Sequence, residues 1–207
     1  MIRSLAPALL LLPALVLAAC SPAGDSAEAP LPDGVWQLAA DQSHVGFVTV
    51  KAGDVGEAHN FKTVAGSVQA DGTVVVEIDL ASVDTGVDIR NERMRDILFE
   101  VASFPQAKLT AKVDPAALRT LKPGERKAMT VPVTLDLHGT TNTIESRLMV
   151  TRLAGDAVLV ETTAPLIVDA SAVGLGDGVE KLRAIANLPA ISKAVPVTAS
   201  MVFKPKT

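Results

Sequence analysis

An Asp-Ser-His cluster near the start of the chain contains the residue types of a nucleophilic catalytic triad. Asp41, Ser43 and His44 make up this cluster. A working triad needs its base within hydrogen-bonding reach of the nucleophile. Ser43 and His44 are neighbours at the start of an expected strand, so their side chains should point to opposite faces. We therefore interpret the cluster as polar residues leading into a strand, and we predict no catalytic residues.

The three histidines are the other residues whose chemistry needs consideration. His44, His59 and His138 show neither HxH nor HExxH spacing. Three imidazoles brought together across strands could still form an open zinc site, so a metal-dependent hydrolase remains a minor alternative. No Gly-rich phosphate loop precedes a helix, and the carboxylates are scattered along the chain. We expect no metal and no cofactor.

Composition argues against nucleic acid as a partner. The formal net charge is −4, and the chain has one Trp and no Tyr. Basic patches and stacking aromatic side chains, which nucleic-acid-binding proteins use, are therefore missing from the sequence.

The first twenty residues, MIRSLAPALLLLPALVLAAC, predict export and anchoring. One basic residue precedes an apolar run that is shorter than the roughly 20 residues of a membrane span, which fits a secretory signal. Leu17-Ala18-Ala19-Cys20 resembles the bacterial lipobox, whose Cys is acylated. We predict a signal peptide over 1–19, then a lipidated Cys20 and flexible tether over 20–34. Ser21 favours the periplasmic face of the outer membrane of a bacterial envelope.

The stretch RNERMRDILFEVASFP, Arg90–Pro105, predicts a short amphipathic helix inside an otherwise β-rich chain. Asn91 or Asp88 can serve as its N-cap. A second helix is expected from Asp177–Glu180, which resembles a capping box, to Pro189. The apolar stripe of the first helix must face another part of the protein, and it consists of residues at i, i+3, i+4 and i+7: Met94, Ile97, Leu98 and Val101.

Residues 35–207 read as one antiparallel β domain. Turn signals at Asp71-Gly72, His138-Gly139 and Gly155-Asp156 separate alternating apolar segments. The fold class that follows is all-β: a single antiparallel, lipocalin-like barrel of about eight strands with one or two short helices at its mouth. Its expected strands are Val35–Ala39, His44–Lys51, Phe61–Ala70, Thr73–Ser82, Ala107–Val113, Thr130–Leu137, Thr143–Leu153, Ala157–Asp169 and Val195–Phe203, with a loop over Asp114–Lys127.

Five motifs in order give the chain a resemblance to the YceI-like family of secreted, lipocalin-like barrels. The motifs are Trp36 leading into Asp41–Phe47; Gly66–Val68 followed by Asp71-Gly72; Asp79–Gly86; Arg90-Asn91, Met94-Arg95, Phe99 and Phe104-Pro105; and Leu135–Thr141. The resemblance covers residues 35–152 well. It weakens at Asp169–Gly174, where family members often carry an Arg and a Phe-Gly pair.

The resemblance implies a barrel that binds a long isoprenoid lipid. The residues expected to line its interior are Phe47, Phe61, Met94, Leu98, Phe99 and Phe104. His44, Arg90 and Arg95 are expected at the rim, where they would orient a head group. From pattern alone, such apolar residues more often belong to a solid core than to a ligand-binding wall.

The leading hypothesis is therefore an envelope lipoprotein, not an enzyme, that binds an isoprenoid lipid, polyprenyl or quinone-type, in the barrel interior. Transport, storage and stress protection are the roles considered. The alternatives are a scaffold protein with a filled barrel and, less favoured, the metal-dependent hydrolase. The expected partners are the isoprenoid lipid or quinone and the membrane, reached through the N-terminal anchor. The oligomeric state stays open, with a dimer possible.

Overall fold

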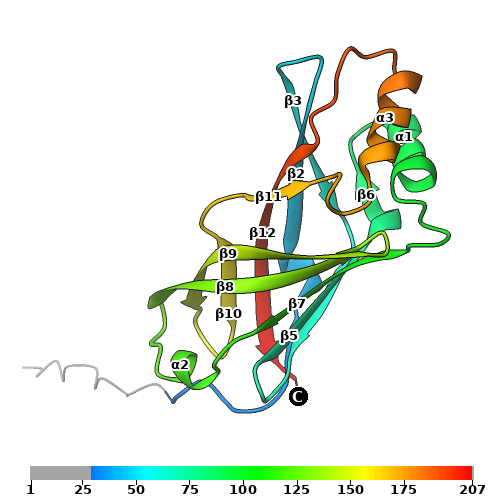
Figure 1. Ribbon diagram of the computed structural model, residues 1–207. Helices are drawn as coiled ribbons and strands as arrows, with labels where there is room; N and C mark the ends of the chain where they lie inside the picture. The colour runs from blue at the N-terminus through cyan, green and yellow to red at the C-terminus, as the bar shows by residue number, and fades with distance from the viewer. Residues whose placement is uncertain (1–28, 207) are drawn as a thin grey trace, which may run out of the picture.

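The expected strands form one continuous antiparallel sheet that closes on itself (Figure 1). The computed structural model describes residues 29–206. The strands are β1 (Trp36–Leu38), β2 (His44–Lys51), β3 (Val55–Phe61), β4 (Val64–Val68), β5 (Thr73–Asp79), β6 (Val83–Asp84), β7 (Gln106–Lys112), β8 (Arg126–Leu137), β9 (Thr140–Arg152), β10 (Val158–Thr162), β11 (Leu166–Asp169) and β12 (Ala194–Pro205).

Eight of these strands complete the barrel. Their order is β1-β4-β5-β7-β8-β9-β10-β12, and β12 pairs with β1 again. The closing pair sets Trp36 opposite Pro205 and Leu38 opposite Phe203. The predicted all-β antiparallel barrel is thus confirmed, and closure leaves no unpaired edge around this ring.

Strand β12 is long enough to serve two neighbours on each side. Along one edge it pairs with β10 and then with β11, and along the other edge with β1 and then with β2. Strand β3 pairs with β2, and the short β6 pairs with β3. The barrel wall therefore extends beyond the closed ring at the end where β2, β3 and β11 lie (Figure 1).

The predicted hairpin turns are present, with the backbone conformations that their glycines allow. Gly72 has a φ of 84°, and a Cβ there would collide with the carbonyl oxygen of Val113. In the β8–β9 turn, His138 and Gly139 have φ values of 51° and 70°. Two successive positive φ values are typical of the tight turns that suit twisted strands.

Several strands and one loop differ from the sequence prediction. Strand β3 was not expected, because Gly56, Glu57 and Asn60 have low β propensity. The strand expected over Ala157–Asp169 is divided into β10 and β11, since Pro165 lacks the N–H that a central strand needs. The expected loop after β7 contains a short helix, α2 (Ala116–Arg119).

Short helical segments lie at one end of the barrel. Helix α1 (Asp88–Arg93) continues into a π-helical turn, η3 (Met94–Leu98), and α3 (Gly176–Ile185) packs against η3. A Cβ at Gly178 would lie 3.0 Å from the Cα of Leu98, so this glycine lets α3 approach η3 closely. Helix α2 lies at the opposite end (Figure 1). Two 3₁₀ turns complete the helical segments, η1 (Ala40–Gln42) and η2 (Leu80–Ser82).

The predicted helix caps are wrong. Helices α1 and α3 begin after Val87 and Leu175, and neither start has a side-chain cap. Asn91 lies inside α1, where its side chain accepts hydrogen bonds from the preceding loop. Glu180 pairs with Arg183 instead of closing a capping box.

The predicted signal peptide and Cys20 lie outside the described residues. Within the described residues 29–206, the last part of the predicted tether packs against the barrel. Leu31 is buried with Leu121, Val150 and Val158, and its N–H donates to the carbonyl of Arg119. An apolar side chain gains by this burial, so the chain meets the barrel earlier than residue 35. Over residues 29–206, none of the helices has the length and apolar character to cross a membrane.

Candidate functional site

The barrel interior contains two adjoining cavities. The α3 cavity, of about 290 Å³, lies among β2, β3, α1, η3 and α3. The α2 cavity, of about 200 Å³, lies toward α2 and residues 31–34. Four side chains line both cavities, namely Leu109, Val133, Ser146 and Leu166. The two cavities therefore follow one another along the interior.

Alternation along β2 and β3 sets the character of the α3 cavity. Phe47, Thr49 and Lys51 alternate along β2 and line the cavity. Glu57 and His59 of the neighbouring strand β3 line the same wall. The register sets Phe47 opposite His59 and Thr49 opposite Glu57. The wall thus changes from aromatic, at Phe47 and Phe61, to charged, at Lys51 and Glu57, toward the outer end of the cavity.

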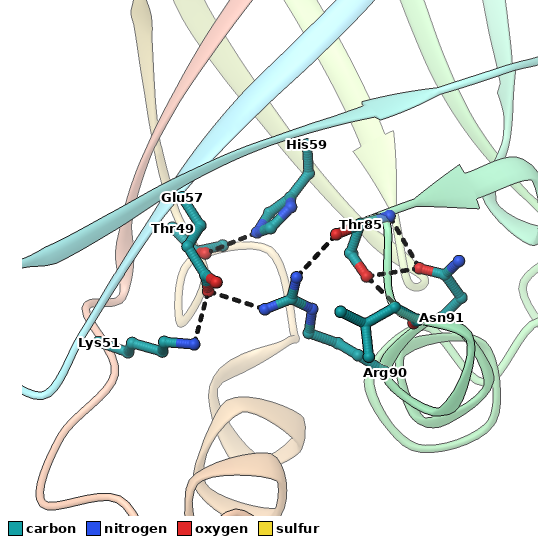
Figure 2. A network of polar contacts seen from close by, with 8 residues as sticks. Thr49, Lys51, Glu57, His59, Thr85, Arg90 and Asn91 are labelled. Carbon is teal, nitrogen blue, oxygen red and sulfur yellow. Dashed lines mark hydrogen bonds and ion pairs between the residues drawn. The ribbon is translucent and has the colours of Figure 1, made fainter.

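A polar network occupies the outer end of this cavity (Figure 2). Thr49 Oγ1 lies 2.9 Å from His59 Nε2. The Glu57 carboxylate accepts from Lys51 Nζ at 2.8 Å and from Arg90 at 2.7 Å. One carboxylate therefore joins strands β2 and β3 to helix α1.

The second half of the network holds α1 in place. Arg90 donates its other terminal nitrogen to the carbonyl of Thr85 at 2.7 Å. The Asn91 side-chain oxygen accepts from the N–H and the hydroxyl of Thr85, at 2.8 and 2.6 Å. Thr85 and Asn91 are both buried, so these bonds fix the loop before α1 and with it the position of Arg90.

Two groups in the network have shifted pKa values. The hydrogen bond from Lys51, helped by the charge of Arg90, lowers the pKa of Glu57 below 4.5. Burial lowers the pKa of His59 below 6.5, and the positive charge of Arg90 lowers it further. At neutral pH the network therefore contains one carboxylate and a neutral imidazole, and the basic side chains of Lys51, Arg90 and Arg93 line the same cavity.

The α2 cavity has a mainly apolar wall closed by chain segments from both sides. Leu31 and Trp36 line it from the N-terminal side, and Leu118 lines it from α2. Arg152, only 2 % exposed, ties these segments together by donating to the carbonyls of Leu121 and Ala29, both at 2.9 Å.

The structure places most of the predicted lining residues on the α3 cavity. They are Phe47, Phe61, Met94, Leu98 and Phe99. Phe104 lies elsewhere and packs on His138, with ring centroids 4.3 Å apart. Of the predicted rim residues, Arg90 lines the cavity, whereas His44 and Arg95 do not. Phe104 was expected to line the interior, but it lies before β7 and packs against the β8–β9 turn at His138 and Gly139.

Sequence reasoning missed His59, Glu57 and Thr49, and it missed the α2 cavity. His59 falls between the expected strands His44–Lys51 and Phe61–Ala70, so it was not placed on a strand. The signal that could have placed it is the i, i+2 series of Glu57, His59 and Phe61, which alternates as a strand does.

The arrangement of the Asp-Ser-His cluster is not that of a triad. The Ser43 hydroxyl donates to the carbonyl of Ala39 and accepts from the N–H of Val202. These two hydrogen bonds connect the chain before β2 to β12. His44 is exposed. Among residues 29–206, no three His, Cys, Asp or Glu side chains are grouped to hold a metal ion.

A closed eight-stranded antiparallel barrel with an apolar interior cavity defines a lipocalin-like protein. The sequence pattern of the YceI-like domain matches residues 36–203. This match covers most of the chain, and the protein belongs to the YceI-like family.

Solved structures agree with this assignment. A polyisoprenoid-binding domain from Saccharophagus degradans, implicated in plant cell wall breakdown, is 39% identical with a TM-score of 0.80, over 83% of this chain and 98% of that one. BcnA of Burkholderia cenocepacia is 22% identical with a TM-score of 0.62, over 80% and 98%. The Campylobacter jejuni YceI protein is 15% identical with a TM-score of 0.54, over 72% and 85%. The last two share the fold. No curated protein matches the chain.

Proposed function

We propose that the protein is a carrier, not an enzyme, that binds an isoprenoid lipid inside the barrel. The observation that carries this proposal is the pair of adjoining cavities, whose walls are mainly apolar. A long apolar chain is the ligand shape that two cavities in series accommodate. The name of the 39% identical relative, a polyisoprenoid-binding domain, supports the same ligand class.

Burial of the chain supplies most of the affinity on this proposal. Each buried CH₂ contributes about 0.8 kcal/mol, so several isoprene units exceed any single polar contact. A solvent-exposed ion pair adds only about 0–1 kcal/mol. The filled-barrel alternative is less favoured, because both cavities would have to be occupied by side chains.

Denaturing solvent extraction of purified protein, followed by mass spectrometry, tests the proposal. We expect a stoichiometric isoprenoid lipid. A matched control changes the outside only: Ile89→Ser with Ile167→Ser removes two apolar side chains that are 52% and 56% exposed. The lipid should persist in this double variant. If the lipid is lost with the surface residues, or if every preparation is lipid-free, the interior is not the binding site.

We further propose that acylation of Cys20 anchors the carrier on the periplasmic face of the outer membrane, where it transports or stores its lipid. The lipobox pattern supports this location. More than one acyl chain is needed for stable anchoring. Cys20→Ala should therefore move the protein from the membrane fraction to the soluble fraction. Membrane retention of this variant would contradict the anchor.

A further inference from the structure

The end of the barrel that carries α2 differs in charge from the rest of the protein. Strand pairing brings several chain segments together there, because Trp36 lies opposite both Val68 and Pro205, and Thr73 lies opposite Lys112. Helix α2 and the end of β12 lie at this end (Figure 1). We call it the α2 face and define it as residues 29–36, 69–73, 112–127, 151–158 and 203–206.

Basic side chains outnumber acidic ones on the α2 face. Its segments contain eight Lys or Arg and five Asp or Glu, a net charge of +3, whereas the chain as a whole carries −4. Three of these cations are paired with carboxylates, namely Lys112 with Asp71, Arg119 with Asp33 and Arg152 with Asp156. Four others are exposed and have no acidic partner among the described residues, namely Lys122, Arg126, Lys204 and Lys206.

The α2 cavity reaches this face. Leu31–Gly34 lines the cavity from one side, and Pro115 and Leu118 line it from the other. The two sides contact each other through the N–H of Leu31, which donates to the carbonyl of Arg119 at 3.1 Å, and through the ion pair of Asp33 with Arg119 at 2.6 Å. Both side chains of this pair are exposed, and exposed ion pairs are weak. A weakly held contact therefore separates the cavity from the α2 face.

The predicted anchor is attached on the same side. The carbonyl of Ala29 accepts a hydrogen bond from the buried Arg152 at 2.9 Å, so the described chain begins on the α2 face. Ala29 is nine residues after Cys20. Nine residues span at most about 30 Å when fully extended. A membrane that holds Cys20 through acyl chains therefore lies within about 30 Å of Ala29.

We propose that the α2 face docks on the surface of a bilayer that contains anionic phospholipid. The four exposed cations lie toward the lipid phosphates, and the α2 cavity is brought next to the membrane that supplies its ligand. The excess of basic side chains matches the negative surface potential of such a bilayer. An acidic protein would match the charge as well, but the short connection to Cys20 favours the bilayer. This inference rests on the proposed function.

Vesicle binding by the purified Cys20→Ala protein tests the docking face without an acyl chain. Vesicles of equal parts phosphatidylcholine and phosphatidylglycerol are compared with pure phosphatidylcholine by co-sedimentation, at about 20 mM salt, where charges are weakly screened. The α2-face variant replaces four side chains by Gln: Lys122, Arg126, Lys204 and Lys206. The control variant lowers the net charge equally by replacing four exposed basic side chains outside the face by Gln: Lys62, Lys108, Arg147 and Lys181.

We expect binding to the anionic vesicles only. Each basic side chain near an anionic bilayer contributes up to about fivefold in affinity, so the α2-face variant should bind at least about thirtyfold more weakly. The control variant should lose less than about threefold. At about 150 mM salt screening should weaken the binding about tenfold, which keeps the Cys20→Ala protein in the soluble fraction of cells.

Thermal unfolding checks that both variants are folded. Equal losses in the two variants would assign the binding to net charge and overturn the docking face. Equal binding to both kinds of vesicle, or binding to neither, overturns it as well. Lipid extraction from the purified wild type is a separate measurement, so a failure of docking leaves the carrier function standing, and a lipid-free barrel would show that the carrier function itself had failed.

Discussion

Ser146 lies at the junction of the two cavities, and enlarging it should shorten the ligand that the barrel can hold. The side chain is fully buried, lines both cavities, and makes one hydrogen bond, to the carbonyl of Ile144 at 3.3 Å. In Ser146→Leu, three added carbons occupy the space between the cavities. Since open volume adjoins the site on both sides, the barrel should fold normally.

The cavity volumes give the size of the effect. A dry cavity of about 150 Å³ accommodates benzene, which has six carbons. By that measure the α3 cavity, about 290 Å³, holds roughly 12 carbons, and the α2 cavity, about 200 Å³, roughly eight. Eight carbons at about 0.8 kcal/mol each set an upper limit of about 6 kcal/mol on the affinity that S146L removes from a 20-carbon prenol. A prenol of ten carbons should be unaffected.

Trp36, the only tryptophan in the sequence, lines the α2 cavity and reports on it directly. In the wild type its fluorescence should change with the 20-carbon prenol and stay constant with the ten-carbon prenol. In S146L neither ligand should change it, and the long prenol should lose at least about a hundredfold in affinity. Ser103→Leu, at an exposed position, is the matched control. If S146L binds the long prenol as the wild type does, or if Trp36 responds equally to both chain lengths, the two cavities are not occupied in series.

Three other perturbations test the parts around the cavities. Leu98→Ala should lower the free energy of unfolding by about 2–5 kcal/mol in urea, because it leaves a void between η3 and α3. Arg152→Met should cost about 1–3 kcal/mol by leaving the buried carbonyl of Leu121 unpaired, and should speed proteolysis near Ala29. The pKa of His59 is lowered from 6.5 in the folded protein, so the unfolded state binds the proton more tightly. The contribution of the neutral ring to the free energy of unfolding is therefore complete above about pH 6.5 and is lost as the pH falls below that value.

The Leu98→Ala and Arg152→Met variants each have a matched control at an exposed site. Ile89→Ala and Arg147→Met should each change the free energy of unfolding by less than about 0.5 kcal/mol. The pH effect is measured as the difference between wild type and His59→Phe from pH 7 to pH 5. Four charged groups act on the His59 ring, namely Lys51, Glu57, Asp84 and Arg90. The carboxylates among them have lowered pKa values, so they do not titrate in this range. Parallel pH curves for the two proteins would contradict the neutral buried ring.

The barrel was predictable because its determinants are local. Alternation in β5 and the turns at Asp71-Gly72 and His138-Gly139 fix strands and connections within a few residues of one another. The apolar spacing of Met94 and Leu98 likewise predicted a helix with one buried face. The π-helical turn η3, in contrast, was not predicted by any local pattern, and it lies where η3 and α3 approach closely at Gly178.

The polar end of the α3 cavity depends on pairing across the sequence, and for that reason it was only partly predictable. Arg90 was assigned to the rim, but its partner Glu57 is 33 residues away, on a strand that was not predicted. His59 lay outside the expected strands, and it is β3 that places it opposite Phe47. Buried polar residues break the apolar alternation by which strands are predicted. A strand that carries a buried polar site is therefore easily missed in the sequence.

The pairing of β1 with β12 has a consequence for how the protein folds. Trp36 and Pro205 come from opposite ends of the described chain, and β12 provides edges for β1, β2, β10 and β11. Contacts of such sequence separation form slowly, because most of the chain must be ordered before they can be made. The ring therefore cannot close until the last strand has been synthesised. Until then the edges of β1 and β10 that pair with β12 have no partner, so the apolar interior is not yet enclosed.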